Sequence, residues 1–289
     1  MRASRVLRAR RDRILQVEDQ RVRPQPERLD HSLGLGADAL ILDLEDSVAP
    51  GAKDAARAHV AAFLAEPRTV PLFVRINPLD SGLSDDDLAA VLPGKPDGVM
   101  LPKAEGAASL AALDAKLSDD IAILPIATET PAAIFTLGTY GGVTDRLIGL
   151  TWGAEDLPAA IGAATSRETD GSYTAPYQLA RSLTLFGAHA AGVAAIETVY
   201  PDFRDLDGLA AYAARGRRDG FTGMMAIHPS QVAVINAAFS PSIDERAKAQ
   251  AIVDLFAANP GAGALQMDGR MVDAPHLKAA RALLALAAD

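Results

Sequence analysis

The chain repeats one pattern, a short apolar run followed by a stretch that suits a helix. Seven clear runs share it, with starts mostly about 23 to 32 residues apart: 39–42, 71–74, 98–101, 121–124, 146–150, 191–196 and 224–227. A continuous apolar run is typical of a strand buried on both faces, and the spacing is that of a βα unit. A weaker run at 14–17 brings the total to eight. Eight βα units predict an α/β fold, namely a (β/α)₈ barrel of the TIM type.

The pattern changes after residue 240. A helix is expected over 243–258, a hairpin-like segment over 264–272 and a final helix over 274–287. This tail is too short for a domain with its own core, so we expect a small helical lid segment, 241–289, that docks on the barrel or on a neighbouring subunit. The barrel is assigned to 26–240 and an atypical leader to 1–25.

The leader is rich in arginine, with Arg2, Arg5, Arg8, Arg10, Arg11 and Arg13 close together. No apolar core follows them, which excludes a secretory signal, and the acidic residues Asp12, Glu18 and Asp19 count against a mitochondrial transit peptide. A solvated leader is the favoured interpretation.

Composition narrows the classes of partner. The formal net charge is −9, which argues against nucleic acid, because a phosphate backbone attracts clustered Lys and Arg. The chain has no cysteine, which excludes disulfides, thiolate metal sites and cysteine nucleophiles. No apolar run approaches the length of a membrane span. We therefore expect a soluble cytoplasmic protein with neither nucleic acid nor membrane as partner.

Ionisable residues follow every one of the seven clear runs. In order they are Asp43 and Glu45, Arg75, Lys103, Glu129, Glu155 and Asp156, Glu197, and His228. In a parallel barrel all these strand ends emerge on one face, where the βα loops build the active site. One such residue is ordinary in a helix cap or a solvated loop, but one after each run indicates an enzyme.

Two of these carboxylates stand at neighbouring strand ends. Two carboxylates such as Glu129 and Asp156 are the ligands that a protein usually contributes to a Mg²⁺ site, in which waters and substrate oxygens complete the octahedron. A salt bridge with arginine or a pair of helix caps is an equally open interpretation. Zinc is disfavoured because the chain has no cluster of histidines.

Each basic residue at the same face has more than one interpretation. Arg75 offers a fork to a carboxylate or a developing oxyanion, or pairs with Asp43 or Glu45. Lys103 has three possible roles: it binds a carboxylate or oxyanion as Arg75 does, it forms a Schiff base, or it is an ion-pair partner. His228 is a base or, more often in such loops, a structural histidine. No Gly-x-Ser-x-Gly elbow or complete nucleotide-binding glycine motif is present.

Several segments together resemble the CitE-like branch of the citrate lyase β-subunit and malyl-CoA lyase superfamily. They are 42–48, 74–77, 101–103, 127–130, 153–157, 203–205, 220–223, 227–231 and 269–273, and the similarity runs from about residue 26 to the end. Members usually open with a strand reading roughly Leu-Phe-Val-Pro-Gly, whereas 16–24 here is strongly charged. The first barrel strand is therefore expected to be degraded or replaced.

The resemblance implies a (β/α)₈ barrel that cleaves or forms a carbon–carbon bond in 3-hydroxyacyl-CoA thioesters, with Mg²⁺ and as a homotrimer or hexamer. It implies Glu129 and Asp156 as metal ligands and Arg75 as the arginine for the substrate oxyanion. Asp273, which spacing alone predicts as an N-cap, is implied as a general acid/base that completes a neighbouring subunit's site. Asp43 and Glu45 are counted as further catalytic candidates, and Lys103 and Glu129 as substrate-binding ones.

The expected function is thus a Mg²⁺-dependent lyase of the citryl-, malyl- or citramalyl-CoA type, with an acyl-CoA thioester and a small oxo acid as partners. Two alternatives remain open. One is hydrolysis of the same thioesters, and the other is a catalytically lapsed protein that binds CoA esters.

Overall fold

The computed structural model describes residues 13–18, 36–118 and 120–286. The chain divides into two compact units, Met1–Asn236 and Ala237–Asp289. The first unit holds eight parallel strands, in the order β5-β4-β3-β2-β1-β8-β7-β6. Their bounds are β1 (Arg13–Glu18), β2 (Ala39–Asp43), β3 (Leu72–Arg75), β4 (Gly98–Leu101), β5 (Ala122–Pro125), β6 (Gly149–Thr151), β7 (Ala194–Glu197) and β8 (Gly223–Ala226).

The two end strands of this order meet each other. Parallel bridges join Ile123 to Leu147 and Ile126 to Thr151, so the β5–β6 seam consists of isolated bridges instead of a continuous ladder. Each apolar run that was predicted as a strand forms a strand of this sheet. The predicted α/β class with a parallel sheet is confirmed.

Strand β1 corrects the expected domain boundary. It lies inside the segment assigned to the leader, yet Leu15 pairs with Ala39 of β2 on one side and Met225 of β8 on the other. The sheet therefore begins before residue 26. The weak run at 14–17 counts as the predicted eighth strand, but the arginines and acids around it led to the assignment of the whole segment to the leader, so the predicted boundary is too late. The replaced first strand is the segment Arg13–Glu18, and the remainder of the leader, 1–12 and 19–25, lies outside the described residues.

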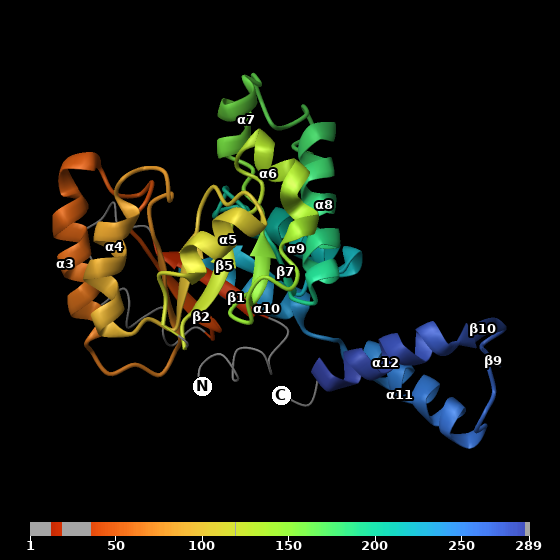
Figure 1. Cartoon of the computed structure of the whole chain (residues 1–289). Coiled ribbons are helices and arrows are strands. Elements are labelled where there is room, and N and C mark those ends of the chain that lie inside the picture. Colours follow the sequence, from red (N-terminus) through yellow and green to blue (C-terminus); the bar gives the residue numbers. More distant parts are fainter. Residues whose placement is uncertain (1–12, 19–35, 119, 287–289) are drawn as a thin grey trace. The chain divides into compact units, whose positions relative to one another are not determined.

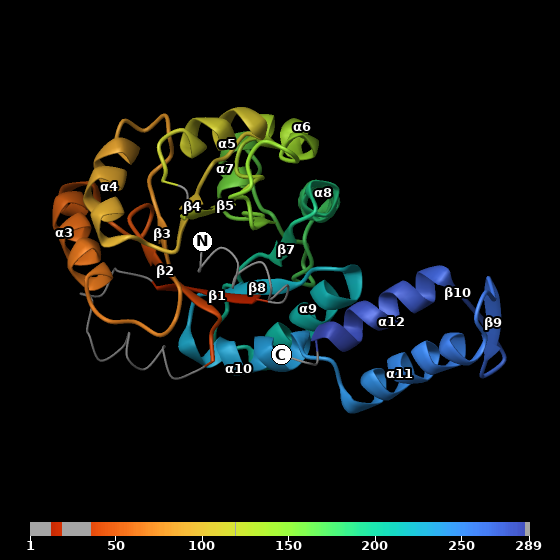
Figure 2. The same ribbon diagram turned by 60° about the horizontal axis from the view of Figure 1, so that its bottom comes forward.

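Helices alternate with the strands and lie outside them (Figures 1 and 2). They are α3 (Lys53–Leu64), α4 (Ser84–Val91), α5 (Ala107–Asp114), α6 (Pro131–Thr136), α7 (Asp156–Ile161), α8 (Ala175–Ala191), α9 (Leu206–Asp219) and α10 (Pro229–Phe239), with short 3₁₀ turns at Pro50–Ala52, Leu92–Gly94 and Leu137–Thr139. Glycine residues Gly162, Gly192 and Gly220 end α7, α8 and α9 in the left-handed conformation, which a residue without Cβ adopts easily.

Alternating side chains of the described strands form an apolar cluster. Its buried members are Ala39, Ile41, Phe73, Met100, Ala122, Leu124, Ile126, Ile196 and Met225. Gly98 leaves room for the Phe73 ring, because a Cβ at that position would lie 2.0 Å from Phe73 Cε1. This packing fixes the strands whose ends carry the polar residues.

The second unit is a helix–hairpin–helix. It comprises α11 (Ile243–Ala258), the antiparallel strands β9 (Ala264–Met267) and β10 (Arg270–Asp273), and α12 (Ala274–Leu286), close to the predicted elements. Ala249, Ile252 and Ala280 form a small buried cluster between the helices. The expectation that this tail has no core of its own is therefore wrong on a small scale, because α11 and α12 already bury a few side chains against each other.

No helix in the described part of the chain is both long and apolar enough to cross a membrane.

Candidate active site

The ends of β2 and β3 are joined by a buried ion pair. Asp43 and Arg75 are register partners on the two strands, and the Asp43 carboxylate accepts from Arg75 Nε at 2.7 Å and Nη2 at 2.6 Å. It also accepts from the backbone N–H groups of Glu45 and Ser47. Burial raises the pKa of Asp43, but its bonds to Arg75 outweigh burial and leave the pKa below the usual value. Asp43 is thus a charged anchor that holds the guanidinium in one orientation.

The third nitrogen of the guanidinium faces another acid. Arg75 Nη1 lies 3.3 Å from Glu45 Oε2, a buried oxygen that receives no aligned hydrogen bond from the described residues. Burial raises the pKa of Glu45 more than Arg75 and Lys103 lower it. Asp43 accepts the Nε proton and one of the two Nη2 protons, so the Nη1 protons and the second Nη2 proton are left for Glu45 and a substrate.

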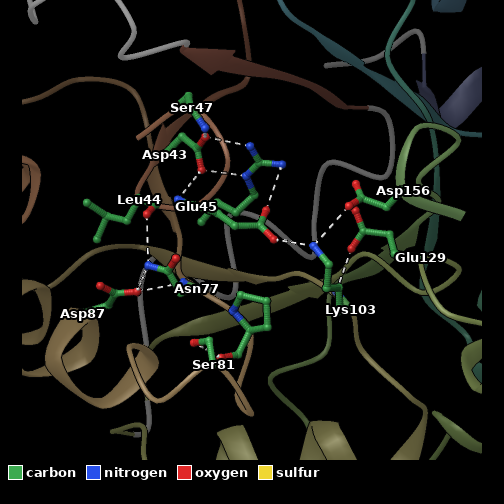
Figure 3. A network of polar contacts seen from close by, with 12 residues as sticks. Asp43, Leu44, Glu45, Ser47, Asn77, Ser81, Asp87, Lys103, Glu129 and Asp156 are labelled. Atoms are coloured by element: carbon green, nitrogen blue, oxygen red, sulfur yellow. Dashed lines mark hydrogen bonds and ion pairs between the residues drawn. The ribbon is translucent and has the colours of Figure 1, made fainter. Parts of the chain in front are cut away.

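Lys103 lies at the centre of three carboxylates (Figure 3). Its Nζ is 2.9 Å from Glu45 Oε1 and 3.2 Å from Asp156 Oδ1, and its backbone N–H donates to Glu129 Oε2 at 2.6 Å. Its backbone is left-handed, with φ 50°, a conformation that costs a non-glycine residue about 1 kcal/mol or more. Burial lowers the pKa of Lys103, but the acids outweigh it and raise the pKa overall, which disfavours the neutral amine that a Schiff base requires.

Glu129 and Asp156 lie beside each other next to this ammonium (Figure 3). Burial, then the charges of Glu45 and Asp156, raise the pKa of Glu129 to about 8. Glu129 is 4% exposed, whereas the Asp156 side chain is 32% exposed. A cation between the two would relieve this electrostatic cost, and carboxylate oxygens are the donors that Mg²⁺ prefers. Among the described residues, no group of three or more His, Cys, Asp or Glu side chains is arranged to hold a metal ion.

The loops that carry these two carboxylates are tied together. Gly153 donates its N–H to Thr128 Oγ1 at 3.0 Å, Thr128 Oγ1 lies 3.3 Å from the Gly153 carbonyl oxygen, and Ala127 N–H donates to the Thr151 carbonyl. Gly153 also allows Glu129 to approach, because a Cβ there would lie 2.7 Å from Glu129 Cγ and 2.9 Å from Oε1.

Gly153→Ala is therefore expected to displace the Glu129 carboxylate and to weaken Mg²⁺ affinity at least tenfold, the size of effect typical of disturbed ligand orientation. Isothermal titration with Mg²⁺ measures this. Gly138→Ala is the matched control, because a Cβ at Gly138 meets nothing within 4 Å. Equal affinity in both variants would contradict the role given to Gly153.

Two other strand-end residues have structural partners. Glu197 is fully buried and accepts from Trp152 Nε1 at 2.6 Å, Arg181 Nε at 2.7 Å and Tyr212 at 2.9 Å. His228 Nδ1 lies 2.7 Å from Ser230 Oγ, and its ring stacks on a neighbouring phenylalanine. The interpretation of His228 as a structural histidine is the one that these contacts support.

Asp273 belongs to the second unit. It directly precedes α12, and His276 Nδ1 lies 2.5 Å from its Oδ1, three residues along the chain. The bond to His276 holds the pKa of Asp273 below its usual value, so the carboxylate is charged at neutral pH. Its part in an active site stays a prediction.

Sequence reasoning missed the polar residues that lie behind Glu45 and Arg75. Lys53, Asn77 and Asp87 are linked by hydrogen bonds, and Asn77 and Asp87 are buried. Lys53 lies in the first turn of a helix and Asp87 in another, where a charged residue is ordinarily solvated, so spacing gave no signal.

Known proteins resemble this chain over most of its length. The HpcH/HpaI aldolase/citrate lyase family model matches residues 24–229. The citrate lyase subunit beta-like protein of Mycobacterium tuberculosis (strain ATCC 25618 / H37Rv) is 36% identical over 266 residues, which cover 92% of this chain and 93% of that protein. Mitochondrial citramalyl-CoA lyase of Mus musculus is 34% identical over 276 residues, which cover 88% of this chain and 80% of that protein.

A solved structure agrees with this similarity. CitE from Mycobacterium tuberculosis in complex with magnesium, acetoacetate and coenzyme A superposes with a TM-score of 0.81 at 33% identity, covering 96% of this chain and 98% of that one. Sequence and fold are similar to these proteins over the same residues, so both comparisons assign the chain to the same family. The chain belongs to the HpcH/HpaI aldolase/citrate lyase family.

Proposed function

We propose that the protein is a Mg²⁺-dependent lyase that cleaves a carbon–carbon bond in a 3-hydroxyacyl-CoA thioester. The observation that carries this proposal is the cluster of Arg75, Lys103, Glu129 and Asp156 at neighbouring strand ends. Relatives named citramalyl-CoA lyase and a neighbour that binds magnesium, acetoacetate and coenzyme A support it.

Glu129 and Asp156 would hold the metal ion. Their oxygens suit Mg²⁺, and the raised pKa of Glu129 records an electrostatic cost that a cation would remove. When bound there, Mg²⁺ supplies a Lewis acid that neutralises the oxygens of the oxo acid and fixes its orientation.

Arg75 would stabilise the charge that develops in the reaction. Cleavage removes the proton of the 3-hydroxyl group, breaks the bond between C2 and C3, turns C3 into the carbonyl of the oxo acid and moves the electron pair into a thioester enolate. Proton addition at C2 then gives the acyl-CoA. Because Asp43 accepts from Nε and from one Nη2 proton, the protons left on Nη1 and Nη2 would donate to the enolate oxygen. The ammonium of Lys103 would attract the acidic substrate from beside the metal ligands.

Asp273 is proposed as the group that takes and returns the proton. Its lowered pKa leaves it charged and able to accept the hydroxyl proton. We propose that the second unit carries it to the site of a neighbouring subunit in a homotrimer or hexamer.

A product assay tests the function. The purified protein is incubated with malyl-CoA or citramalyl-CoA, with Mg²⁺ or with EDTA. We expect acetyl-CoA together with glyoxylate or pyruvate, only in the presence of Mg²⁺. Free CoA without an oxo acid would indicate hydrolysis, and no product would indicate a binding protein. Either result would contradict the proposal.

A further inference from the structure

A polar cluster, with Lys53 half-buried and its other members buried, lies directly behind the Glu45–Arg75 part of the site. It consists of Lys53 on α3, Asn77 after β3, Asp87 on α4 and Arg57 on α3, and is called here the Lys53 cluster. Figure 3 shows Asn77 between the Leu44 carbonyl oxygen and the Asp87 carboxylate. None of these residues reaches a reacting atom in the proposed mechanism.

All three protons of the Lys53 ammonium have an acceptor. Nζ donates to the carbonyl oxygens of Leu44 at 2.6 Å and Glu45 at 2.8 Å, and to Asn77 Oδ1 at 2.7 Å. The first two acceptors belong to the turn after β2, which presents Glu45. The third lies two residues after Arg75. One ammonium therefore joins the two turns whose side chains face each other in the site.

The other half of the cluster fixes Asn77. Its side-chain amide donates to the Leu44 carbonyl at 3.0 Å and to Asp87 Oδ2 at 2.6 Å, and its backbone N–H donates to the same oxygen at 2.7 Å. Asp87 is fully buried, and Arg57 Nε donates to its other oxygen at 2.8 Å. Each polar atom is thus satisfied within the protein, which makes the arrangement stiff.

We infer that Lys53 and Asn77 are positioning residues, which hold the turn after β2 and thereby set where the Glu45 carboxylate lies relative to Lys103 and the Arg75 guanidinium that Asp43 anchors. This inference rests on the proposed lyase function. A free turn after β2 would let the Glu45 carboxylate leave Arg75 and Lys103, and a displacement of about 1 Å at a catalytic group reduces the rate about 10²-fold.

The test compares three variants. Lys53→Met keeps the length of the side chain and removes its donors, and Lys53→Gln keeps two donors without the charge, as a milder change that preserves folding. Lys116→Met is the control, because Lys116 pairs with the exposed Asp85 in the same unit. The steady-state kinetics with citramalyl-CoA are measured per folded molecule, well below the melting temperature of each variant.

We expect kcat to fall about 10- to 100-fold in Lys53→Met and less in Lys53→Gln, with KM within about threefold of the wild type, and no change in Lys116→Met. An unchanged kcat with only a lower melting temperature would reduce Lys53 to a purely structural residue and overturn the inference.

Hydrogen exchange provides a readout that does not depend on activity. In Lys53→Met the backbone amides of Glu45 and Ser47, which donate to Asp43, should exchange at least about tenfold faster, whereas those of α9 should not change. Unchanged exchange at Glu45 and Ser47 would overturn the inference even in an enzyme that is active. If the wild type cleaves no thioester, the lyase proposal fails and exchange alone decides the positioning role.

Discussion

Arg75→Lys is expected to lower kcat about 10²- to 10³-fold, the loss typical of removing one donor to a developing oxyanion. The guanidinium contacts Asp43 through two nitrogens, and its third nitrogen lies 3.3 Å from Glu45, on the side where we propose that the substrate binds. A lysine ammonium cannot span both carboxylates and still offer a donor to the enolate oxygen. Steady-state kinetics with citramalyl-CoA measures the effect.

The substitution also separates activity from folding. Arg75→Ala leaves the fully buried Asp43 without its partner, which is expected to reduce the free energy of unfolding by about 3–5 kcal/mol, so lysine is the informative replacement. Arg68→Lys is the control, since Arg68 pairs with Asp97 at a partly exposed position. If Arg75→Lys retains the kcat of Arg68→Lys, Arg75 does not stabilise the enolate.

Glu129→Gln is expected to reduce kcat at least about 10³-fold while leaving the fold at least as stable as the wild type. The amide keeps the shape of the side chain but removes the charge that would bind Mg²⁺. Because Glu45 and Asp156 repel the Glu129 carboxylate, loss of the charge removes an unfavourable interaction. Kinetics at saturating Mg²⁺ and chemical unfolding in EDTA measure the two effects, and Glu66→Gln at an exposed position is the control.

The effect of Glu129→Gln on stability depends on pH. The pKa of Glu129 is raised from 4.5 in the unfolded chain to about 8 in the folded one, so the folded state binds the proton more tightly. The metal-free protein should therefore lose stability as the pH rises from 4.5 through 8. Glu129→Gln should lose less over this range, with a difference of at least about 1 kcal/mol in the free energy of unfolding. Parallel pH curves for the two proteins would contradict the raised pKa.

The fold could be predicted because each buried parallel strand leaves a continuous apolar run. The exception is β1, whose backbone pairing with β2 and β8 depends on strands distant in sequence. Its own composition, Arg-Ile-Leu-Gln-Val-Glu, gives only a weak signal.

The main residues of the site could be predicted for a related reason. Parallel strands bring their carboxyl ends to one face, so Asp43, Arg75, Lys103 and Glu129 had to lie near each other. The pairing of Arg75 with Asp43 and Glu45 was among the predictions, but the partners contributed by the surrounding helices could not be predicted. Lys53 contacts the Leu44 and Glu45 carbonyls only because α3 folds back over the turn, and Glu197 meets side chains from α8 and α9.

Isothermal titration of Mg²⁺ in the presence of pyruvate, into the wild type and Asp156→Asn, tests the pair of carboxylates on which the mechanism depends. The wild type should bind one ion per chain, and the variant should bind at least about tenfold more weakly while its melting temperature in EDTA stays near that of the wild type. Equal binding by both proteins would place the metal elsewhere and remove the basis of the proposed reaction.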